Sequence, residues 1–175
     1  MADKHGRPPA PGDLADALRA VAAAVALVTV ADGRDDVGVT VSTLCPVSAD
    51  PPLVSVALLG GTYPAELLRR VDGFAVTVLA AGQRAVAGRF AAAGRPGARR
   101  LLEGTGEPLP RGPRSGALIA AGGLAGLDCT VTRRIEAGDH LLVIGEVAGV
   151  AYVAEAGQPL VRFRGRYPGL APVTS

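Results

Sequence analysis

Three hydroxyl side chains stand together at the end of one predicted strand. In the stretch "GVTVSTLCPVSADPPLVSV", from Gly38 to Val56, apolar and polar residues alternate, and Thr40, Ser42 and Thr43 then form a short polar cluster. A break at a proline and an Asp-Pro-Pro turn follow before the next apolar run. Hydroxyls at a strand end can hydrogen-bond a polar ligand, but threonine is also an ordinary strand residue. The cluster is therefore a candidate binding site that needs further support.

A second stretch, "GGTYPAELL" from Gly60 to Leu68, has the composition of a phosphate-binding turn. The paired glycines allow a ligand to approach the backbone closely, and Thr62 is a candidate N-cap for a helix with Pro64 in its first turn. The first N–H groups of such a helix, together with the Thr62 hydroxyl, suit an anion. A glycine turn with an ordinary threonine cap explains the same residues, so this stretch alone also leaves the function open.

Motifs for several other chemistries are missing from the chain. It has no P-loop, no GxGxxG after a strand, no GxSxG and no HExxH, and its two histidines are His5 and His140. Cys45 and Cys129 have no metal-ligand spacing, so no metal site is predicted and both cysteines are expected to be structural. A site built from hydroxyls and backbone amides therefore remains the best candidate.

Length and composition indicate one globular domain. The 175 residues are 49% hydrophobic and 19% charged, with a net charge of +2, which does not suggest a nucleic-acid partner. No apolar run is long enough to span a membrane, and the N-terminus lacks the apolar segment of a signal peptide. We expect a flexible tail at 1–12, a domain at 13–170, a C-terminal tail at 171–175, and a cytoplasmic location.

The elements that must position the candidate residues are mainly strands. Asp13 is a candidate N-cap for a first helix, with Leu14, Leu18 and Val21 at helical spacing. Further helices are predicted from 62 and at 82–93, and a long excursion at 94–116. Strands are predicted near 25–30, 37–43, 53–59, 74–79, 127–135, 140–154 and 159–167, with a turn at 136–139. Because several neighbours are joined by turns, an antiparallel barrel is favoured over a doubly wound sheet.

Taken together and in order, these stretches resemble the flavin reductase-like, FMN-binding split-barrel family, in its small two-component reductase branch. The quoted strand-end stretch is joined by "ALVTVADG", "FAVTVLAAGQRAVAGRFA", "LDCTVTRRIEAGDHLLVIGEV" and "PLVRFRGRY", so the resemblance runs from about Leu18 to Leu170. It implies a mainly β fold with short helices, an antiparallel Greek-key split β-barrel, and a homodimer. It also implies hydride transfer from NADH or NADPH to FMN or FAD, with reduced flavin passed to a partner monooxygenase.

The resemblance further implies roles for individual residues. His140, in the Gly-Asp-His turn, is implied on the nicotinamide side as the catalytic residue, where it would position or polarise the carboxamide. Thr62 is implied at the flavin phosphate. The implied flavin-binding residues are Thr40, Val41, Ser42, Thr43, Ala57, Leu58, Leu59, Thr62, Arg89, Phe90 and Tyr167.

Two other functions fit the same resemblance. One is a split-barrel oxidase that retains its flavin and acts directly on a small substrate, and the other is a non-catalytic flavin- or haem-binding carrier or sensor. The sequence does not choose between FMN and FAD or between NADH and NADPH, and it does not identify the partner oxygenase.

Overall fold

The computed structural model describes residues 11–33, 36–91, 97–98, 102 and 110–171. The predicted tail up to residue 10, most of the 94–116 excursion and residues 172–175 lie outside these ranges. The helices are α1 (Pro11–Leu18), α2 (Tyr63–Leu68) and α3 (Arg84–Ala91), with a 3-10 helix η1 (Ala81–Gln83) before α3. The strands are β1 (Ala23–Ala24), β2 (Ala26–Val30), β3 (Val37–Val41), β4 (Cys45–Ala49), β5 (Pro52–Leu59), β6 (Gly73–Val78), β7 (Ala125–Ala137), β8 (His140–Val153) and β9 (Val161–Arg162).

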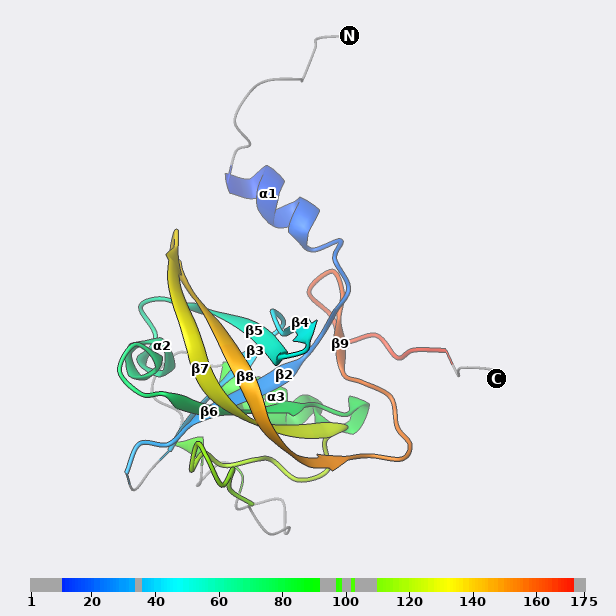
Figure 1. Cartoon of the computed structure of the whole chain (residues 1–175). Coiled ribbons are helices and arrows are strands. Elements are labelled where there is room, and N and C mark those ends of the chain that lie inside the picture. The colour runs from blue at the N-terminus through cyan, green and yellow to red at the C-terminus, as the bar shows by residue number, and fades with distance from the viewer. Residues whose placement is uncertain (1–10, 34–35, 92–96, 99–101, 103–109, 172–175) are drawn as a thin grey trace, which may run out of the picture.

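Seven strands form one antiparallel sheet in the order β3-β2-β6-β7-β8-β5-β4, and β1 pairs with β9 separately. The strands β6, β7 and β8 are neighbours in sequence order, and β5 lies beside β8, which is Greek-key connectivity. Figure 1 shows this sheet curling strongly, with α2 on one side of it and α1 projecting from the body. The prediction of a mainly β, antiparallel split barrel is confirmed.

The two edges of the curled sheet meet without a continuous main-chain ladder. Strand β3 packs against β5, but β4 pairs with β5 only as far as Ser55. Beyond that point the side chain of Thr43 replaces the missing strand: its Oγ1 accepts from the N–H of Ala57 (3.0 Å) and donates to the carbonyl of Ala57 (2.8 Å). The Thr43 hydroxyl therefore continues the pairing of β4 with β5 at the split edge of the barrel.

Strand β2 is buried on both faces because it separates two hydrophobic clusters. Val28 and Val30 point into the barrel, whereas Leu27 belongs to a second cluster with Phe90 of α3. An apolar residue at nearly every position, as in "ALVTV", is what a strand covered on both faces requires. The helix α3 is thereby fixed against the outside of the β2–β3 region.

Asp128 of β7 lies on the side of the strand opposite Cys129, outside the barrel, and it is only 1% exposed. Its carboxylate accepts from the N–H groups of Arg114 (2.8 Å) and Ser115 (3.0 Å), so the segment after residue 110 covers it. The side chain does leave the barrel interior, but another part of the chain supplies hydrogen bonds in place of water.

Strand β4 corrects a prediction from the sequence. The Pro46 region was predicted as a break that ends the strand, yet Cys45–Ala49 forms a short pair with β5, with an irregularity between Pro46 and Ser48. Proline is tolerated there because β4 is the last strand of the sheet and its residues are largely exposed. At the other end of the chain, α1 begins at Pro11 rather than after Asp13. None of the helices in the described residues is both long and apolar enough to cross a membrane.

Candidate functional site

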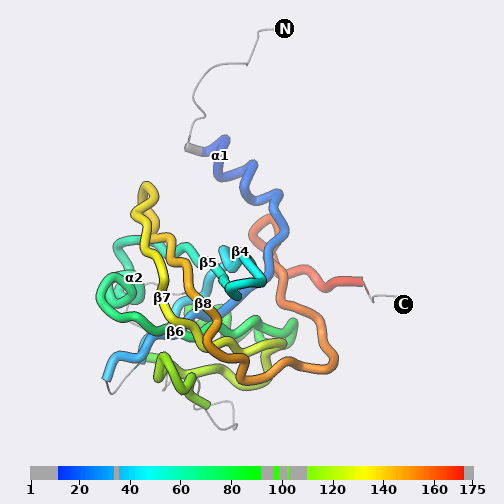
Figure 2. The backbone as a smooth tube through the Cα atoms, in the orientation of Figure 1, coloured from blue at the N-terminus to red at the C-terminus, as the bar shows by residue number. Residues whose placement is uncertain are grey.

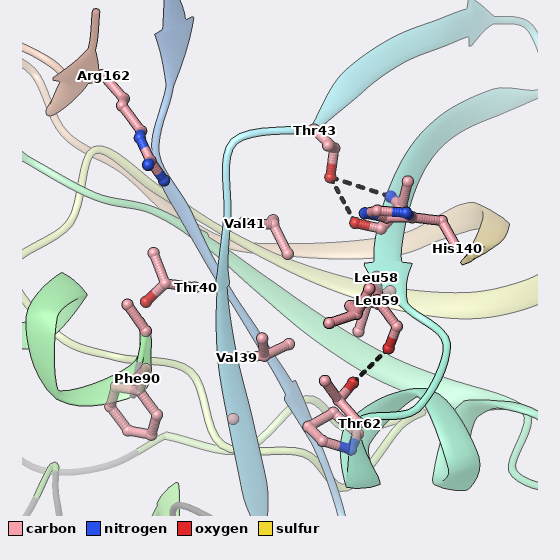
Figure 3. A pocket seen from close by; sticks show the side chains of 14 residues that line it. Val39, Thr40, Val41, Thr43, Leu58, Leu59, Thr62, Phe90, His140 and Arg162 are labelled. Carbon is pink, nitrogen blue, oxygen red and sulfur yellow. Dashed lines mark hydrogen bonds between the residues drawn. The ribbon is translucent and has the colours of Figure 1, made fainter. Parts of the chain in front are cut away.

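A pocket of about 380 Å³ opens where β3 and β5 face each other across the split. Strand β3 supplies one wall, and β5 and the start of α2 supply the other; α3 contributes two residues, and β8 and β9 contribute one each (Figure 3). The lining residues are Gly38, Val39, Thr40, Val41, Thr43, Ala57, Leu58, Leu59, Thr62, Pro64, Phe90, Ala91, His140 and Arg162.

The walls of the pocket are apolar and closely packed. Val39, Val41, Leu58 and Leu59 present branched side chains toward the space between the strands (Figure 3). Gly38 lets the ring of Phe90 lie directly on β3, since a Cβ at this position would be 2.8 Å from two ring carbons. Such a slot suits a flat, largely apolar ring system.

Three threonines line the pocket, and each already donates its hydroxyl hydrogen within the protein. Thr40 donates to the carbonyl of Ala87 in α3 (2.8 Å), Thr62 donates to that of Leu59 (2.7 Å), and Thr43 donates to Ala57. Thr62 precedes α2 at the predicted place, with Pro64 in the first turn, but its side chain does not cap the helix as predicted. These hydroxyls can accept hydrogen bonds from a ligand, but their donors are engaged.

The ionisable side chains of the lining stand on different sides of the pocket. His140 opens β8 and pairs with Leu59 at the end of β5, and its Nδ1 lies 2.6 Å from Oδ1 of Asp139. This hydrogen bond and the charge of a protonated His140 lower the pKa of the Asp139 carboxyl. Arg162 enters from β9 on the α3 side, with its guanidinium directed toward Thr40 (Figure 3). Together they offer nitrogen donors at both ends of an apolar slot.

Most of the residues expected to bind flavin are brought together here. Nine of them, counting the predicted catalytic histidine, line the pocket: Thr40, Val41, Thr43, Ala57, Leu58, Leu59, Thr62, Phe90 and His140.

Three expected residues lie elsewhere. Ser42 lines a separate groove, since it follows β3 and points away from Thr43. Arg89 is exposed on α3, because neighbouring helical residues point about 100° apart and Phe90 takes the inward position. Tyr167 is half-buried against the second hydrophobic cluster, where the guanidinium of Arg84 lies 5.4 Å from its ring centroid. Flavin contacts by these three residues are therefore not supported by the shape of the main pocket.

Sequence reasoning missed Arg162 in this pocket. It was one arginine among many in "PLVRFRGRY", and only the pairing of β9 with β1, which joins Ala23 to Arg162, carries it beside β3. The alternation of that last strand could have indicated which of its arginines share one face. It could not have indicated which other part of the chain lies opposite that face.

The sequence identifies the family to which this architecture belongs. Residues 18–171 match the family described as "Flavin reductase like domain". This chain is a member of that flavin reductase family. The match spans β1 to the C-terminal segment and therefore includes every strand that lines the pocket.

Relatives and solved structures agree with this membership over nearly the whole chain. The NADH-dependent FMN reductase AsuE2 of Streptomyces nodosus subsp. asukaensis is 33% identical over 95% of this chain and 88% of its own length. The reductase component of 4-hydroxyphenylacetate 3-monooxygenase from Thermus thermophilus is 33% identical over 87% of this chain and 91% of its own. The structure of the Streptomyces globisporus C-1027 NADH:FAD oxidoreductase SgcE6 with NAD and FAD fragments superposes with a TM-score of 0.84, at 29% identity, covering 97% of this chain and all of that one.

Proposed function

We propose that this flavin reductase family member is an NAD(P)H:flavin oxidoreductase that reduces FMN or FAD and supplies the reduced flavin to a partner monooxygenase. The observation that carries the proposal is the apolar pocket in the split between β3 and β5, in a chain of this family. When bound, a flavin accepts a hydride from the nicotinamide of NAD(P)H, so the protein need only bind and orient the two molecules.

The residues of the pocket fit a flavin. Among the apolar lining residues, Val39 and Leu59 keep exposed surface for a tricyclic ring, whereas Val41 and Leu58 are buried, and the slot measures about 380 Å³. The threonine hydroxyls can accept from ring N–H groups, while Arg162 can donate to an anionic tail.

His140 is the side chain we assign to the nicotinamide. It lines the pocket, is partly exposed, and its Nδ1 lies 2.6 Å from Oδ1 of Asp139. Asp139 therefore fixes the orientation of the ring. We expect His140→Ala to slow NAD(P)H oxidation about tenfold while the dissociation constant for flavin changes less than about twofold. Equal turnover in variant and parent would remove His140 from the reaction.

The test of the function is consumption of NADH and NADPH with and without excess FMN or FAD. Many turnovers that depend on added flavin are the expected result. A permanently yellow protein that ignores NAD(P)H would indicate a flavin oxidase or carrier instead, and a haem absorption band would indicate a haem-binding module.

The proposal also includes a partner monooxygenase, a homodimer and a cytoplasmic location. The Thermus relative is named as a monooxygenase component, which supports a monooxygenase as the consumer of reduced flavin. A homodimer is supported by apolar side chains exposed on β8, and a cytoplasmic location suits an enzyme whose reductant is NAD(P)H.

A further inference from the structure

The hairpin of β7 and β8, whose turn leads into His140, reaches past the body of the sheet. Figure 2 shows its yellow end rising beyond α2. The pairing of β6 with β7 ends at Thr130, and the last residues of β7, 132–137, are all exposed. Segments with few buried contacts open easily, so the position of His140 depends on the hydrogen bonds that attach this end of the hairpin.

Arg69, at the end of α2, binds the hairpin just before its turn. Its Nε and Nη2 donate to the two carboxylate oxygens of Glu136 on β7, at 2.7 and 3.1 Å. A pair with two parallel bonds fixes the orientation of the groups as well as their distance. The same hydrogen bonds raise the pKa of the Arg69 guanidinium and lower the pKa of the Glu136 carboxyl, so both groups are charged at neutral pH.

The third nitrogen of Arg69 reaches the turn itself through Gly60. Nη1 of Arg69 donates to the carbonyl of Gly60 (2.9 Å), and the N–H of Gly60 donates to the carbonyl of Asp139 (2.8 Å). The fit is close, since a Cβ on Gly60 would lie 3.1 Å from the Asp139 carbonyl oxygen and 3.2 Å from Nη2 of Arg69. One guanidinium therefore connects the strand before the turn with the residue that binds the turn.

These contacts converge on residues of the main pocket. Leu59, which precedes Gly60, pairs with His140 across β5 and β8. Thr62 donates both its N–H (3.1 Å) and its hydroxyl (2.7 Å) to the carbonyl of Leu59. Leu59, Thr62 and His140 all line the pocket, whereas Arg69 does not. Arg69 can therefore act on a ligand only through the residues that it holds in place.

A second arginine makes a connection between the same two elements in the opposite direction. Arg134 of β7 donates from Nε to the carbonyl of Leu68 (2.6 Å) and from Nη2 to the carbonyl of Val71 (2.7 Å). A helix leaves its last carbonyls without partners in the helix, and Arg134 satisfies one of them here. Arg134 therefore attaches β7 to the end of α2, and Arg69, whose partner on β7 is nearer the turn, attaches the part that carries His140.

We propose that Arg69 is a positioning residue for the hydride transfer: by holding the hairpin turn from both sides, it keeps the His140 imidazole at the pocket. The inference rests on the proposed function, in which His140 is assigned to the nicotinamide. It requires no contact between Arg69 and either ligand. Loss of the arginine should therefore slow turnover and leave the flavin-binding wall on β3 unchanged.

The test compares Arg69→Gln with Arg70→Gln. Glutamine removes the charge and the forked donors of arginine. Arg70 has the same charge at the next position, but its Nε bonds back to the carbonyl of Glu66 within α2 (3.4 Å). We expect Arg69→Gln to lower kcat for NADH oxidation about fivefold, less than His140→Ala does, because the imidazole is displaced rather than removed. The dissociation constant for FMN should change less than about twofold, and Arg70→Gln should match the parent.

Two further measurements separate positioning from a general loss of stability. In a His140→Ala background, Arg69→Gln should have no further effect on NADH oxidation, because the group through which it acts is missing. Hydrogen exchange, measured without flavin or NADH, should be at least about threefold faster at the amides of Gly60 and residues 136–142 in Arg69→Gln. Arg70→Gln should leave these exchange rates unchanged.

The outcomes that overturn the inference are distinct from failure of the proposed function. Independent, multiplicative losses in the Arg69→Gln/His140→Ala variant, or equal exchange rates in parent and Arg69→Gln, would overturn the positioning role. Weaker FMN binding large enough to explain the slower turnover would do the same. If the parent consumes no NAD(P)H with either flavin, the proposed function fails and this inference with it. An active parent whose Arg69 variant keeps full turnover overturns this inference alone.

Discussion

At the scale of single residues, burial decides which polar groups remain available for chemistry. The donors of Thr40, Thr43 and Thr62 are engaged in holding the elements around the pocket, whereas His140 and Arg162 at its ends keep nitrogen donors for a ligand. The hydroxyl cluster that first marks the site in the sequence therefore acts mainly on the shape of the pocket. Charge recognition falls to residues from the C-terminal half of the chain.

Burial also changes the acidity of one of the two cysteines. Cys129 is completely buried in the barrel, and burial, with a smaller contribution from the charge of Asp128, raises the pKa of its thiol from 9.0 to about 12. Between these values the folded protein keeps a proton that the unfolded chain releases, so the free energy of unfolding must fall as the pH rises from 9 to 12. The loss amounts to at most about 4 kcal/mol.

Cys129→Ala should remove this part of the pH dependence. Its stability at pH 8 is lower because of the cavity, but its decline between pH 9 and 11 should be shallower than that of the parent. Urea unfolding at several pH values measures both. Cys45→Ala is the control, since Cys45 is exposed and its loss should leave the slope unchanged. Parallel curves for parent and Cys129→Ala would contradict the assignment.

At the scale of elements, the pocket depends on the contact of α3 with β3. Gly38 is the point of closest approach, and the ring of Phe90, 1% exposed, has no room to retreat. Thr40 ties the same two elements through the carbonyl of Ala87. The glycine contact and the hydrogen bond add to the packing of Val86, Ala87 and Phe90 in the second hydrophobic cluster, and the position of the helix sets one end of the pocket.

Gly38→Ala should therefore destabilise the fold by about 1–3 kcal/mol, because the added methyl overlaps the ring of Phe90. Adding Phe90→Leu should recover part of this loss, which a double-mutant cycle would show as a favourable coupling energy. Gly88→Ala is a matched control with the opposite expected sign: it lies in α3 with nothing within 4 Å of the added Cβ, so it should stabilise by up to about 1 kcal/mol. Equal effects of the two alanines in urea unfolding would refute the packing argument.

Local patterns predicted most of these elements and much of the site. The alternation in β7, the Gly-Asp turn before His140 and the helix at 84–91 all follow from neighbouring residues, and they are where they were predicted. The burial of Asp128 and the position of Arg162 do not follow from neighbouring residues, because each depends on a segment distant in the chain. Asp128 is covered by residues 114–115, and Arg162 is positioned by the pairing of β9 with β1. Contacts between residues far apart in the chain cannot be predicted from the local pattern of a single sequence.

At the scale of the whole molecule, the barrel leaves part of its surface apolar. The sequence of β8, "HLLVIGEVAGVAYV", carries apolar residues on both faces, which is typical of a barrel wall or a subunit interface. One face carries Leu141 and Val143 into the core, while Val150 and Val153 near its end are 57% and 71% exposed. Large side chains exposed together on one strand are typical of protein–protein interfaces. These two valines are therefore where we place the proposed contact between subunits.

Val150→Glu combined with Val153→Glu should separate the proposed dimer. Burying two unpaired carboxylates in an apolar contact is strongly unfavourable, so the dissociation constant should rise at least about tenfold, or about 1.4 kcal/mol. Sedimentation equilibrium measures this directly, because the chain is 17.6 kDa and its dimer twice that mass. Leu170→Glu, an exposed apolar residue outside the sheet, should leave the dimer intact. A parent that sediments as a monomer, or a double variant that dimerises as tightly as the parent, would place the interface elsewhere or remove it, and the exposed end of β8 would then need another occupant.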